Sequence, residues 1–487
     1  MTFTLQQWIA LLPILAVAGT AVFVMLAIAV RRNHWWNATF CVAGLNAALF
    51  WTLLVFYLYD GPQQITPLLV VDAYALFYYA LILVLTLATA TLSHAYLEGH
   101  RGFKEENYVL LSVAALGALV LASSTHFASF FLGLEILSVP LYGMVAYVWR
   151  DARSLEAGVK YLILSAGASA FLLFGMALVY SQAGTLGFIE MGDAIGRIEG
   201  FGNPYLLAGA GMIIVAVGFK LSLVPFHLWT PDVYEGAPAP VGAFLATVSK
   251  TAVFVVLLRW FVQGHADQFD ALVDALSALA FVSIIVGNVL ALLQTNIKRL
   301  FAYSSIAHIG YLLVALIAAG EFRVEAVGMY LITYSVTQLG AFGVVALMSS
   351  PRGERDADNL YDYRGLFWRR PLLVAIMVPM MLSLAGIPIT AGFIGKFYVI
   401  AAGIDSGLWW LIGAVVFGSA IGLYYYLRVV VTMFMQDPER LKFDAPINWA
   451  QQVGGVMVLL LTLLMFVLGV YPGPVIELIR LAGLPAH

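Results

Sequence analysis

Long apolar segments separated by short polar turns recur from one end of this chain of 487 residues to the other. Each segment is about 20 residues long, the length that an α-helix needs to cross the hydrocarbon core of a bilayer. The pattern therefore predicts an all-α protein that crosses the membrane about fourteen times. The approximate limits of the spans are 8–30, 37–59, 71–94, 107–123, 127–148, 157–182, 204–227, 238–262, 272–293, 299–319, 325–348, 371–403, 407–435 and 451–471.

Two of these spans contain residues that break a helix. The seventh leads into a segment with four prolines between residues 225 and 240, and the twelfth is too long for a straight span and contains Gly386-Ile387-Pro388. We expect both to be discontinuous. Because they are five spans apart, spans 4–8 and 9–13 would form two five-helix repeats of opposite orientation, a pattern typical of transporters. The predicted domains are a three-helix segment (1–106), the first repeat (107–265), the second repeat (266–436), and a C-terminal helix and tail (437–487).

The distribution of Lys and Arg between the loops predicts the orientation. Loops after odd-numbered spans hold fifteen basic residues and those on the opposite side hold four, which places the odd-numbered loops in the cytoplasm and both termini outside. The fifteen are Arg31, Arg32, Arg101, Lys104, Arg150, Arg153, Lys298, Arg299, Arg352, Arg355, Arg364, Arg369, Arg370, Arg440 and Lys442, and the four are Arg197, Arg259, Arg323 and Arg480.

The composition excludes several classes of function. Hydrophobic residues make up 62% of the chain and charged residues 10%, against about 25% charged in soluble proteins. The single cysteine, Cys41, rules out a disulfide framework and a cysteine-ligated zinc or iron–sulfur site. No Walker A or dinucleotide-binding motif is present. We therefore expect no cofactor, no metal and no nucleic acid bound to this chain. The first apolar run lacks the basic start of a signal peptide and is expected to remain as a helix.

A few charged residues lie inside the predicted spans, where a charge is costly and commonly marks an ion path. The basic ones are Lys160, Lys220, Lys250, Lys396 and Arg428, and Glu135 is the acidic residue near the middle of a span.

Glu135, Lys220, Lys250 and Lys396 are the main candidates for a proton relay. A buried lysine and a nearby carboxylate influence each other's protonation, so Glu135 and Lys220 are expected to form a coupled pair. Lys220 and Lys396 each lie near a break, and we expect them to be counterparts in the two repeats. Lys250 falls close to the middle of the membrane. A static Glu135–Lys220 ion pair, or a neutral Glu135 that serves only packing, are the structural alternatives.

His308, His227 and Lys160 are secondary candidates. His308 lies in mid-span, and imidazole is well suited to relay protons at neutral pH, although it can equally be a hydrogen-bonded core residue. His227 follows the seventh break and could take up protons from the cytoplasm. Lys160 is only about a turn inside its span, so its ammonium could reach the surface instead.

Five stretches of the chain are similar to the antiporter-like subunits of respiratory complex I, a family related to subunits of multi-subunit cation/proton antiporters. They contain the four main candidates and His308, and read LEILSVPLYGMVAY, GFKLSLVPFHLWTPDVYEGAPAPV, ATVSKTAVF, KRLFAYSSIAHIGY and SLAGIPITAGFIGKFYV. The resemblance covers nearly the whole chain. It is greatest to the N-type subunits of NADH–quinone oxidoreductase, because M-type subunits typically have glutamate at the position of Lys396 and L-type subunits carry a long lateral helix after the core.

The resemblance implies fourteen helices in two inverted repeats and a proton path along the middle of the membrane. By position, it implies that Glu135 and Lys220 are the coupling pair, Lys250 the central relay and Lys396 the residue near the exit, with Lys160 matching a further lysine of the family. NADH, flavin, iron–sulfur and quinone chemistry would belong to partner subunits, and an M-type subunit and a small K-type subunit would be neighbours.

The sequence thus predicts a proton-translocating subunit of NADH–quinone oxidoreductase. A change in partner subunits would alter the Glu135–Lys220 interaction and drive a proton from Lys220 through Lys250 and His308 to Lys396. A unit charge at 4 Å is worth about 4 kcal/mol at an effective dielectric of 20, enough to displace a proton. A subunit of a sodium/proton antiporter and a purely structural membrane subunit are the alternatives.

Overall fold

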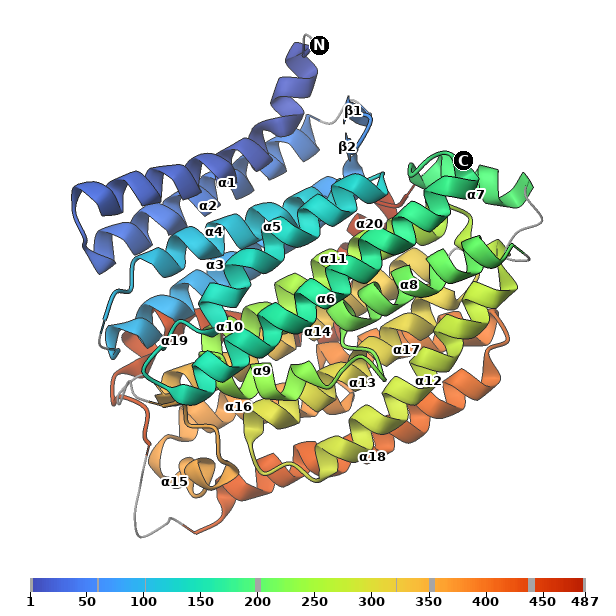
Figure 1. The fold of residues 1–487 in the computed structure, drawn as a ribbon. Coiled ribbons are helices and arrows are strands. Elements are labelled where there is room, and N and C mark those ends of the chain that lie inside the picture. The colour runs from blue at the N-terminus through green and yellow to red at the C-terminus, as the bar shows by residue number, and fades with distance from the viewer. Residues whose placement is uncertain are drawn as a thin grey trace.

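Long helices that run roughly parallel to one another form nearly the whole molecule (Figure 1). The computed structural model describes residues 3–484 except 59–60, 101, 198–202, 321, 350–354 and 437–442. Within these residues, twelve helices are long and apolar enough to cross a membrane, and the shorter apolar helices Glu106–Ala122 and Pro371–Ala385 bring the total to fourteen. The predicted all-α, polytopic membrane fold is confirmed.

The observed helices follow the predicted spans closely, mostly within four residues at each end. They are α1 (Leu5–Val30), α2 (His34–Tyr57), α3 (Ala73–Glu98), α4 (Glu106–Ala122), α5 (Phe127–Val145), α6 (Ala152–Ala183), α8 (Pro204–Leu221) with α9 (Trp229–Gly236), α10 (Ala239–Phe244) with η2 (Leu245–Ser249) and α11 (Lys250–Gln263), α12 (Asp270–Leu292), α13 (Ile297–Ile317), α14 (Phe322–Ser349), α16 (Pro371–Ala385) with α17 (Ala391–Asp405), α18 (Trp409–Phe434) and α19 (Val453–Val470).

The centre of the array is formed by the span from α10 to α11 together with α13 and α14, which are buried over their whole apolar length. At the edge lie α1 and α2, of whose apolar windows only 33% and 28% is buried. The central helices therefore pack on protein on all sides, and polar side chains on them must find partners inside the molecule.

Both predicted helix breaks are present. The first half-helix α8 ends at Leu221, Ser222 adopts the left-handed conformation (φ 66°), and the chain resumes as α9 at Trp229. The break contains a cis peptide bond before Pro225, and the amide of Val224 donates to the Ser283 hydroxyl at 3.0 Å. The twelfth span is broken in the same way: α16 ends at Ala385, Gly386 is left-handed (φ 86°), and α17 follows.

The expected equivalence of Lys220 and Lys396 in the two repeats stays a prediction, although the two lysines lie on different halves of their broken helices. Lys220 lies in the last turn of α8, before its break, whereas Lys396 lies in α17, after its break. The two lysines therefore approach the middle of the molecule on opposite halves of their broken helices. The repeat boundaries remain predictions.

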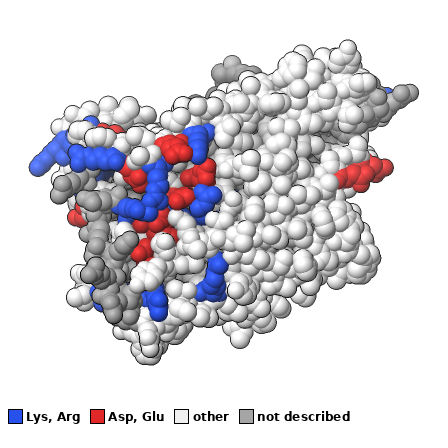
Figure 2. Space-filling view, turned by 60° about the horizontal axis from the view of Figure 1, so that its bottom comes forward, with Lys and Arg blue, Asp and Glu red and all other residues white. Residues whose placement is uncertain are grey.

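Charged side chains gather at one end of the molecule, where the α1–α2 turn and α15 (Leu366–Arg369) lie, while the long apolar flank shows few (Figures 1 and 2). This agrees with the predicted charge asymmetry for the basic residues that are described; Arg101, Arg352, Arg440 and Lys442 lie outside the described residues. One assignment is wrong. Arg259, taken as a loop residue of the opposite side, is completely buried in α11 and forms a two-pronged ion pair with Asp72 at 2.6 and 2.8 Å.

Several short elements were not predicted. They are the hairpin of β1 (Gln63–Thr66) and β2 (Leu69–Val71), α7 (Phe188–Arg197), the π-helical turn η2, the single 3-10 turns η3 (Ala266–Gln268), η4 (Leu360–Tyr363) and η5 (Trp449–Gln451), and α20 (Gly473–Leu481). The two strands pair antiparallel with each other. Most of these elements connect or cap spans, but η2 directly precedes Lys250 and belongs to the site.

Candidate proton-transfer site

The Lys220 ammonium is buried at the end of α8 and is held by two hydroxyl groups. Its Nζ donates to Ser138 Oγ at 2.6 Å and to Ser165 Oγ at 2.7 Å, and the side chain is 7% exposed. Tyr142 also donates to Ser165, at 2.7 Å. Helices α5 and α6 therefore supply the immediate surroundings of the ammonium, and all its direct partners are neutral.

Glu135 lies one turn before Ser138 on α5 but does not touch Lys220. Its carboxylate accepts a hydrogen bond from Ser169 Oγ at 2.5 Å, and no Glu135–Lys220 ion pair forms within 4.0 Å. Glu135 is only partly buried, in the middle of its helix. Glu135 and Lys220, the expected coupling pair, are therefore separated by serine side chains instead of forming a direct ion pair. Glu135 also reaches the molecular surface.

Lys250 lies at the centre of the molecule, where the π-helical turn η2 passes into α11. The side chain is 2% exposed, and its Nζ donates to Ser305 Oγ on α13 at 2.6 Å. The Tyr334 hydroxyl donates to the same oxygen at 2.7 Å, and the Tyr234 ring centroid lies 5.9 Å from the ammonium. A π-turn widens a helix locally and is frequent at functional sites, which fits its position beside a buried charge.

His308 follows Ser305 by three residues on α13 and is hydrogen-bonded through both ring nitrogens. Nδ1 lies 2.7 Å from the Tyr330 hydroxyl, and Nε2 lies 3.1 Å from the Tyr426 hydroxyl. A neutral imidazole donates through one nitrogen and accepts through the other, so this geometry lets the ring pass a proton between two hydroxyl groups. The Tyr426 hydroxyl also bonds to Ser304.

Lys396 reaches back from α17 to the break that precedes it. Its Nζ donates to the backbone carbonyl of Ala385 at 2.9 Å and lies 5.3 Å from the centroid of the Tyr311 ring. The Ala385 carbonyl belongs to the end of α16, where the partial negative charge of a helix terminus favours a cation. A Cβ at Gly386 would lie 2.8 Å from Lys396 Cδ, so the glycine leaves room for the lysine as well as allowing the turn.

One face of α13 links the two lysines of the second half of the site. Ser305, His308 and Tyr311 follow one another at three-residue spacing, with Lys250 at the first and Lys396 at the last. Six residues of helix rise correspond to about 9 Å. Neighbouring hydroxyl and amide groups extend this polar face: Tyr425 donates to Asn288, which donates to Tyr311.

Aromatic rings of α6, α8 and α9 pack together next to Lys220. Tyr161 stacks on Trp229 with centroids 4.8 Å apart, and Trp229 packs against Phe219 at 5.2 Å. In the described part of the chain, no direct hydrogen bond joins the Lys220 group to the Lys250 group. Transfer between them therefore needs water or a movement of side chains.

Lys160 lies apart from this buried row, in a cluster of ion pairs at the charged end. The Lys160 side chain is 42% exposed, and its Nζ lies 2.7 Å from Glu156 and 2.9 Å from Asp232. Arg299 pairs with the same Asp232 at 2.7 Å. Burial alone would raise the pKa of the Asp232 carboxyl, but the hydrogen bonds from Lys160 and Arg299 hold this pKa below its usual value. The geometry favours a fixed ion pair, and a part for Lys160 in the relay stays a prediction.

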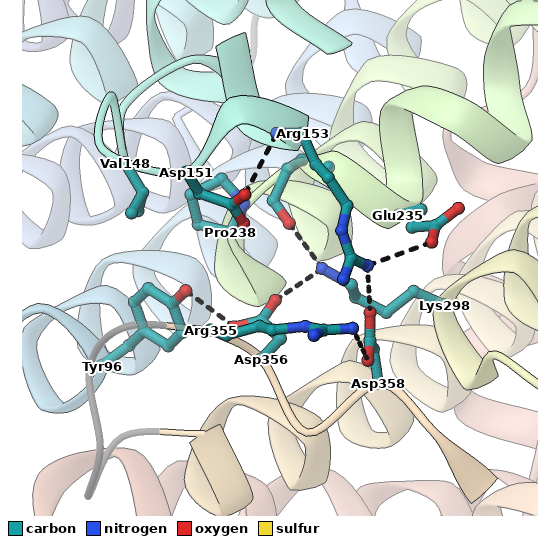
Figure 3. A pocket seen from close by; sticks show the side chains of 12 residues that line it. Tyr96, Val148, Asp151, Arg153, Glu235, Pro238, Lys298, Arg355, Asp356 and Asp358 are labelled. Atoms are coloured by element: carbon teal, nitrogen blue, oxygen red, sulfur yellow. Dashed lines mark hydrogen bonds and ion pairs between the residues drawn. The ribbon is translucent and has the colours of Figure 1, made fainter. Parts of the chain in front are cut away.

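A second part of this ion-pair cluster joins the loop before Leu360 to the short turn between α9 and α10 (Figure 3). Lys298 donates to Asp356 at 2.6 Å and to the Ala237 carbonyl at 2.9 Å, and Tyr96 donates to Asp356 at 2.7 Å. These contacts hold the loop before Leu360 against the turn between α9 and α10, at the charged end of the molecule.

His227 lies in the break between α8 and α9 and is 6% exposed. Both ring nitrogens are buried without a hydrogen-bond partner among the described residues. The structure brings it to neither the Lys220 hydroxyl groups nor the ion-pair cluster, so its predicted role in proton uptake stays a prediction.

Sequence reasoning missed the partners of the charged groups. These are the serines on α5 and α6 and the tyrosines around His308, namely Ser138, Ser165, Ser169, Tyr330, Tyr334 and Tyr426. A usable signal exists for the serines: Ser138 follows Glu135 by three residues, and Ser165 and Ser169 are four apart, so each set shares a helix face.

The fold and the site together define a polytopic membrane protein with a row of buried, titratable side chains across its middle. The chain belongs to the family described as NADH:quinone oxidoreductase/Mrp antiporter, TM, whose profile matches residues 124–422. Proton translocation across the membrane is the function that this membership supports.

Three solved structures are similar over almost their whole length. A chain of respiratory complex I from Thermus thermophilus with bound aureothin is 34% identical, with 96% of this chain and 98% of that chain covered and a TM-score of 0.81. A chain of the archaeal membrane-bound sulfane sulfur reductase is 24% identical (97% and 96% covered, TM-score 0.83). A chain of the Mrp complex from Dietzia sp. DQ12-45-1b is 19% identical (99% and 97% covered, TM-score 0.84). The last two similarities concern the fold alone.

Proposed function

We propose that this chain is the N-type antiporter-like subunit of a bacterial NADH–quinone oxidoreductase and that its buried lysine row carries protons across the membrane. The observation that carries the proposal is the burial of Lys220, Lys250 and Lys396 without a carboxylate partner. Each is at most 7% exposed, and none lies within 4.0 Å of a carboxylate in the described part of the chain. An unpaired buried ammonium costs several kcal/mol. Three of them in one core are explained by groups that gain and lose a proton.

The proposed path begins at Glu135 and Lys220. A displacement of the Glu135 carboxylate removes its attraction for the Lys220 ammonium and favours proton release. The proton moves to Lys250, then by way of Ser305 and His308 along α13 to Lys396. His308 accepts at one nitrogen and donates from the other, so it is neutral before and after each transfer.

Partner subunits complete the proposed machine. Glu135 and Ser169 are partly exposed in the middle of their helices, where contact with lipid tails would be costly. A neighbouring membrane subunit that covers them explains this exposure and provides the place where a conformational signal arrives. An M-type subunit and a small K-type subunit are the proposed neighbours. NADH, flavin, iron–sulfur clusters and quinone belong to other partners, and the termini of this chain lie in the periplasm.

The similarity to a chain of Thermus complex I at 34% identity favours this proposal over an antiporter subunit, because the Mrp chain is similar at 19%. Purification of the tagged chain in mild detergent distinguishes them. We expect flavin- and iron–sulfur-containing subunits to co-purify. Recovery with membrane subunits alone, in a preparation that retains all other assembled complexes, would favour the antiporter.

The relay itself is tested by Lys250→Met, which removes the charge and keeps the length of the side chain. In inverted membrane vesicles we expect a strong loss of protons pumped per NADH oxidised, with the complex still assembled on a native gel. Lys104→Met is the matched control, because the hydrogen bond of the Lys104 ammonium among the described residues is to the Glu98 carbonyl, outside the core. A purely structural subunit would keep its pumping ratio in both variants.

A further inference from the structure

A groove of about 380 Å³ is lined by residues from the end of α1 and the start of α2. These two helices lie at the edge of the helix array (Figure 1). Its walls are mainly apolar: Phe23 and Leu26 of α1 and Trp36 of α2 are 50–56% exposed. The Phe40 ring packs edge-on against Phe23 at 5.2 Å. A sealed cavity of about 150 Å³ already holds a benzene ring, so this groove has room for a segment of an acyl chain.

The polar end of the groove is formed by Arg31, Asn33 and Asn37. Asn37 is completely buried and donates to the Asn33 carbonyl at 2.9 Å, while its Oδ1 has no hydrogen-bond partner in the described part of the chain. A buried carbonyl oxygen without a donor is costly. A shift of the Asn37 amide into the groove would let a ligand hydroxyl donate to this oxygen and remove the cost.

The charge at this end is positive and uncompensated. Arg32 already has partners within the chain, since it pairs with Glu106 at 2.6 Å and lies 4.2 Å from the Phe103 ring centroid. The Arg31 side chain, by contrast, is exposed, and no described residue pairs with it. A single arginine at the mouth of an apolar groove is complementary to one anionic headgroup.

The position of the groove along the helices matches a membrane boundary. Trp35 and Trp36 are 57% and 50% exposed and follow Arg32 by three and four residues, and both residue types concentrate where hydrocarbon meets water. This end also carries the excess of basic residues, which marks the cytoplasmic side. Acyl chain, phosphate and headgroup would therefore meet the groove at the depth where a lipid of the inner leaflet presents them.

We propose that this groove binds an anionic glycerophospholipid of the cytoplasmic leaflet, with an acyl chain along Phe23, Leu26 and Trp36, the phosphate at Arg31, and a headgroup hydroxyl near Asn37. Phosphatidylglycerol has these features. The proposal does not depend on the proton relay, because none of these residues takes part in it.

The experiment uses the purified native complex that contains this chain, reconstituted in phosphatidylcholine vesicles with a trace of phosphatidylglycerol that carries a photoreactive acyl chain. After illumination, labelled peptides are quantified by mass spectrometry. We expect strong labelling of the peptide that spans residues 22–40. Removing one lipid-facing basic charge costs about fivefold in affinity, so Arg31→Gln should lower this labelling about fivefold. Ala27→Phe, which fills the groove, should abolish it.

Arg150→Gln is the matched control, since Arg150 is an exposed arginine that lies over Trp149, outside the groove. It should leave the labelling unchanged. Equal labelling by photoreactive phosphatidylcholine would mean contact with bulk lipid only and would overturn the proposal. Absence of labelling by either lipid would mean that a protein partner covers the groove, which also overturns it. A native gel shows that each variant complex is assembled.

Discussion

The hydroxyl of Ser165 offers a sharp test of the Lys220 site, because it accepts a hydrogen bond from the ammonium at 2.7 Å in a buried setting. In Ser165→Ala this acceptor is lost, while Ser138 remains at 2.6 Å. A hydrogen bond to a charged group is worth about 1.5–3 kcal/mol, and 1.36 kcal/mol corresponds to a factor of ten. Because Ser138 remains as an acceptor, we use the lower end of this energy range, about 1.5 kcal/mol. The protonated form of Lys220 should therefore be disfavoured about tenfold.

The sign of the effect follows from which form is weakened. The ammonium loses a hydrogen-bond acceptor and the neutral amine does not. Protonation of Lys220 to the same extent therefore requires about a tenfold higher proton concentration. The pH profile of pumping should move by about one unit toward acid. We would measure dye-reported proton uptake into inverted vesicles and NADH oxidation in parallel, across the neutral pH range, and compare the ratio of the two at each pH.

Two further variants make the test specific. Ser165→Thr keeps a hydroxyl acceptor and should restore the original profile. Ser181→Ala removes an exposed hydroxyl from the same helix α6 that donates to the Leu178 carbonyl at 2.7 Å and accepts from Gln182 at 3.1 Å, without contact to Lys220, and it should leave the pH profile unchanged. If Ser165→Ala gives an assembled complex whose pH profile coincides with that of the parent, the assignment of Lys220 as a loading site is refuted.

Two other substitutions test the frame around the site. Gly386→Ala places a Cβ in a left-handed turn, which costs about 1–2 kcal/mol, and brings it within 2.8 Å of Lys396 Cδ. We therefore expect a lower melting temperature and reduced pumping. Gly413→Ala, with open space around the added Cβ, is the control and should be neutral in both assays. Arg259→Met leaves the buried Asp72 carboxylate without its ion-pair partner, at a cost of about 3–5 kcal/mol. Little assembled complex should therefore appear on native gels. The double variant with Asp72→Asn removes the unpaired charge and should recover part of the assembled complex. Full assembly of the single Arg259 variant would show that this ion pair is dispensable.

Hydropathy predicted the spans well because each is a local property of about 20 consecutive residues. The two breaks were also visible locally, as proline and glycine inside apolar segments. The positions of Lys220, Lys250 and Lys396 inside the core followed from the span limits alone. What the spans could not supply is which faces of which helices meet, and this decides every partner of these three charges.

The errors have the same cause. Arg259 and Asp72 are 187 residues apart, and nothing local connects them; the position of Arg259 inside the predicted span 238–262 was nevertheless a warning that it is no loop residue. The amphipathic helix α7 had a local signal, because its buried residues Phe188, Met191, Gly192 and Ile195 follow helical spacing. The segment is too short and too polar for a search that looks only for membrane spans.

The three buried lysines all have uncharged direct partners, and this affects the order in which protons can pass. Their direct partners are hydroxyl groups and a backbone carbonyl, which stay uncharged, so every arriving proton adds a full unit of charge to the core. Two such charges about 9 Å apart, the length of α13 between Ser305 and Tyr311, repel by roughly 2 kcal/mol at an effective dielectric of 20. Simultaneous occupation of Lys250 and Lys396 is then disfavoured roughly 30-fold. Protons would pass in single file, and each would have to vacate its lysine before the next one could settle nearby.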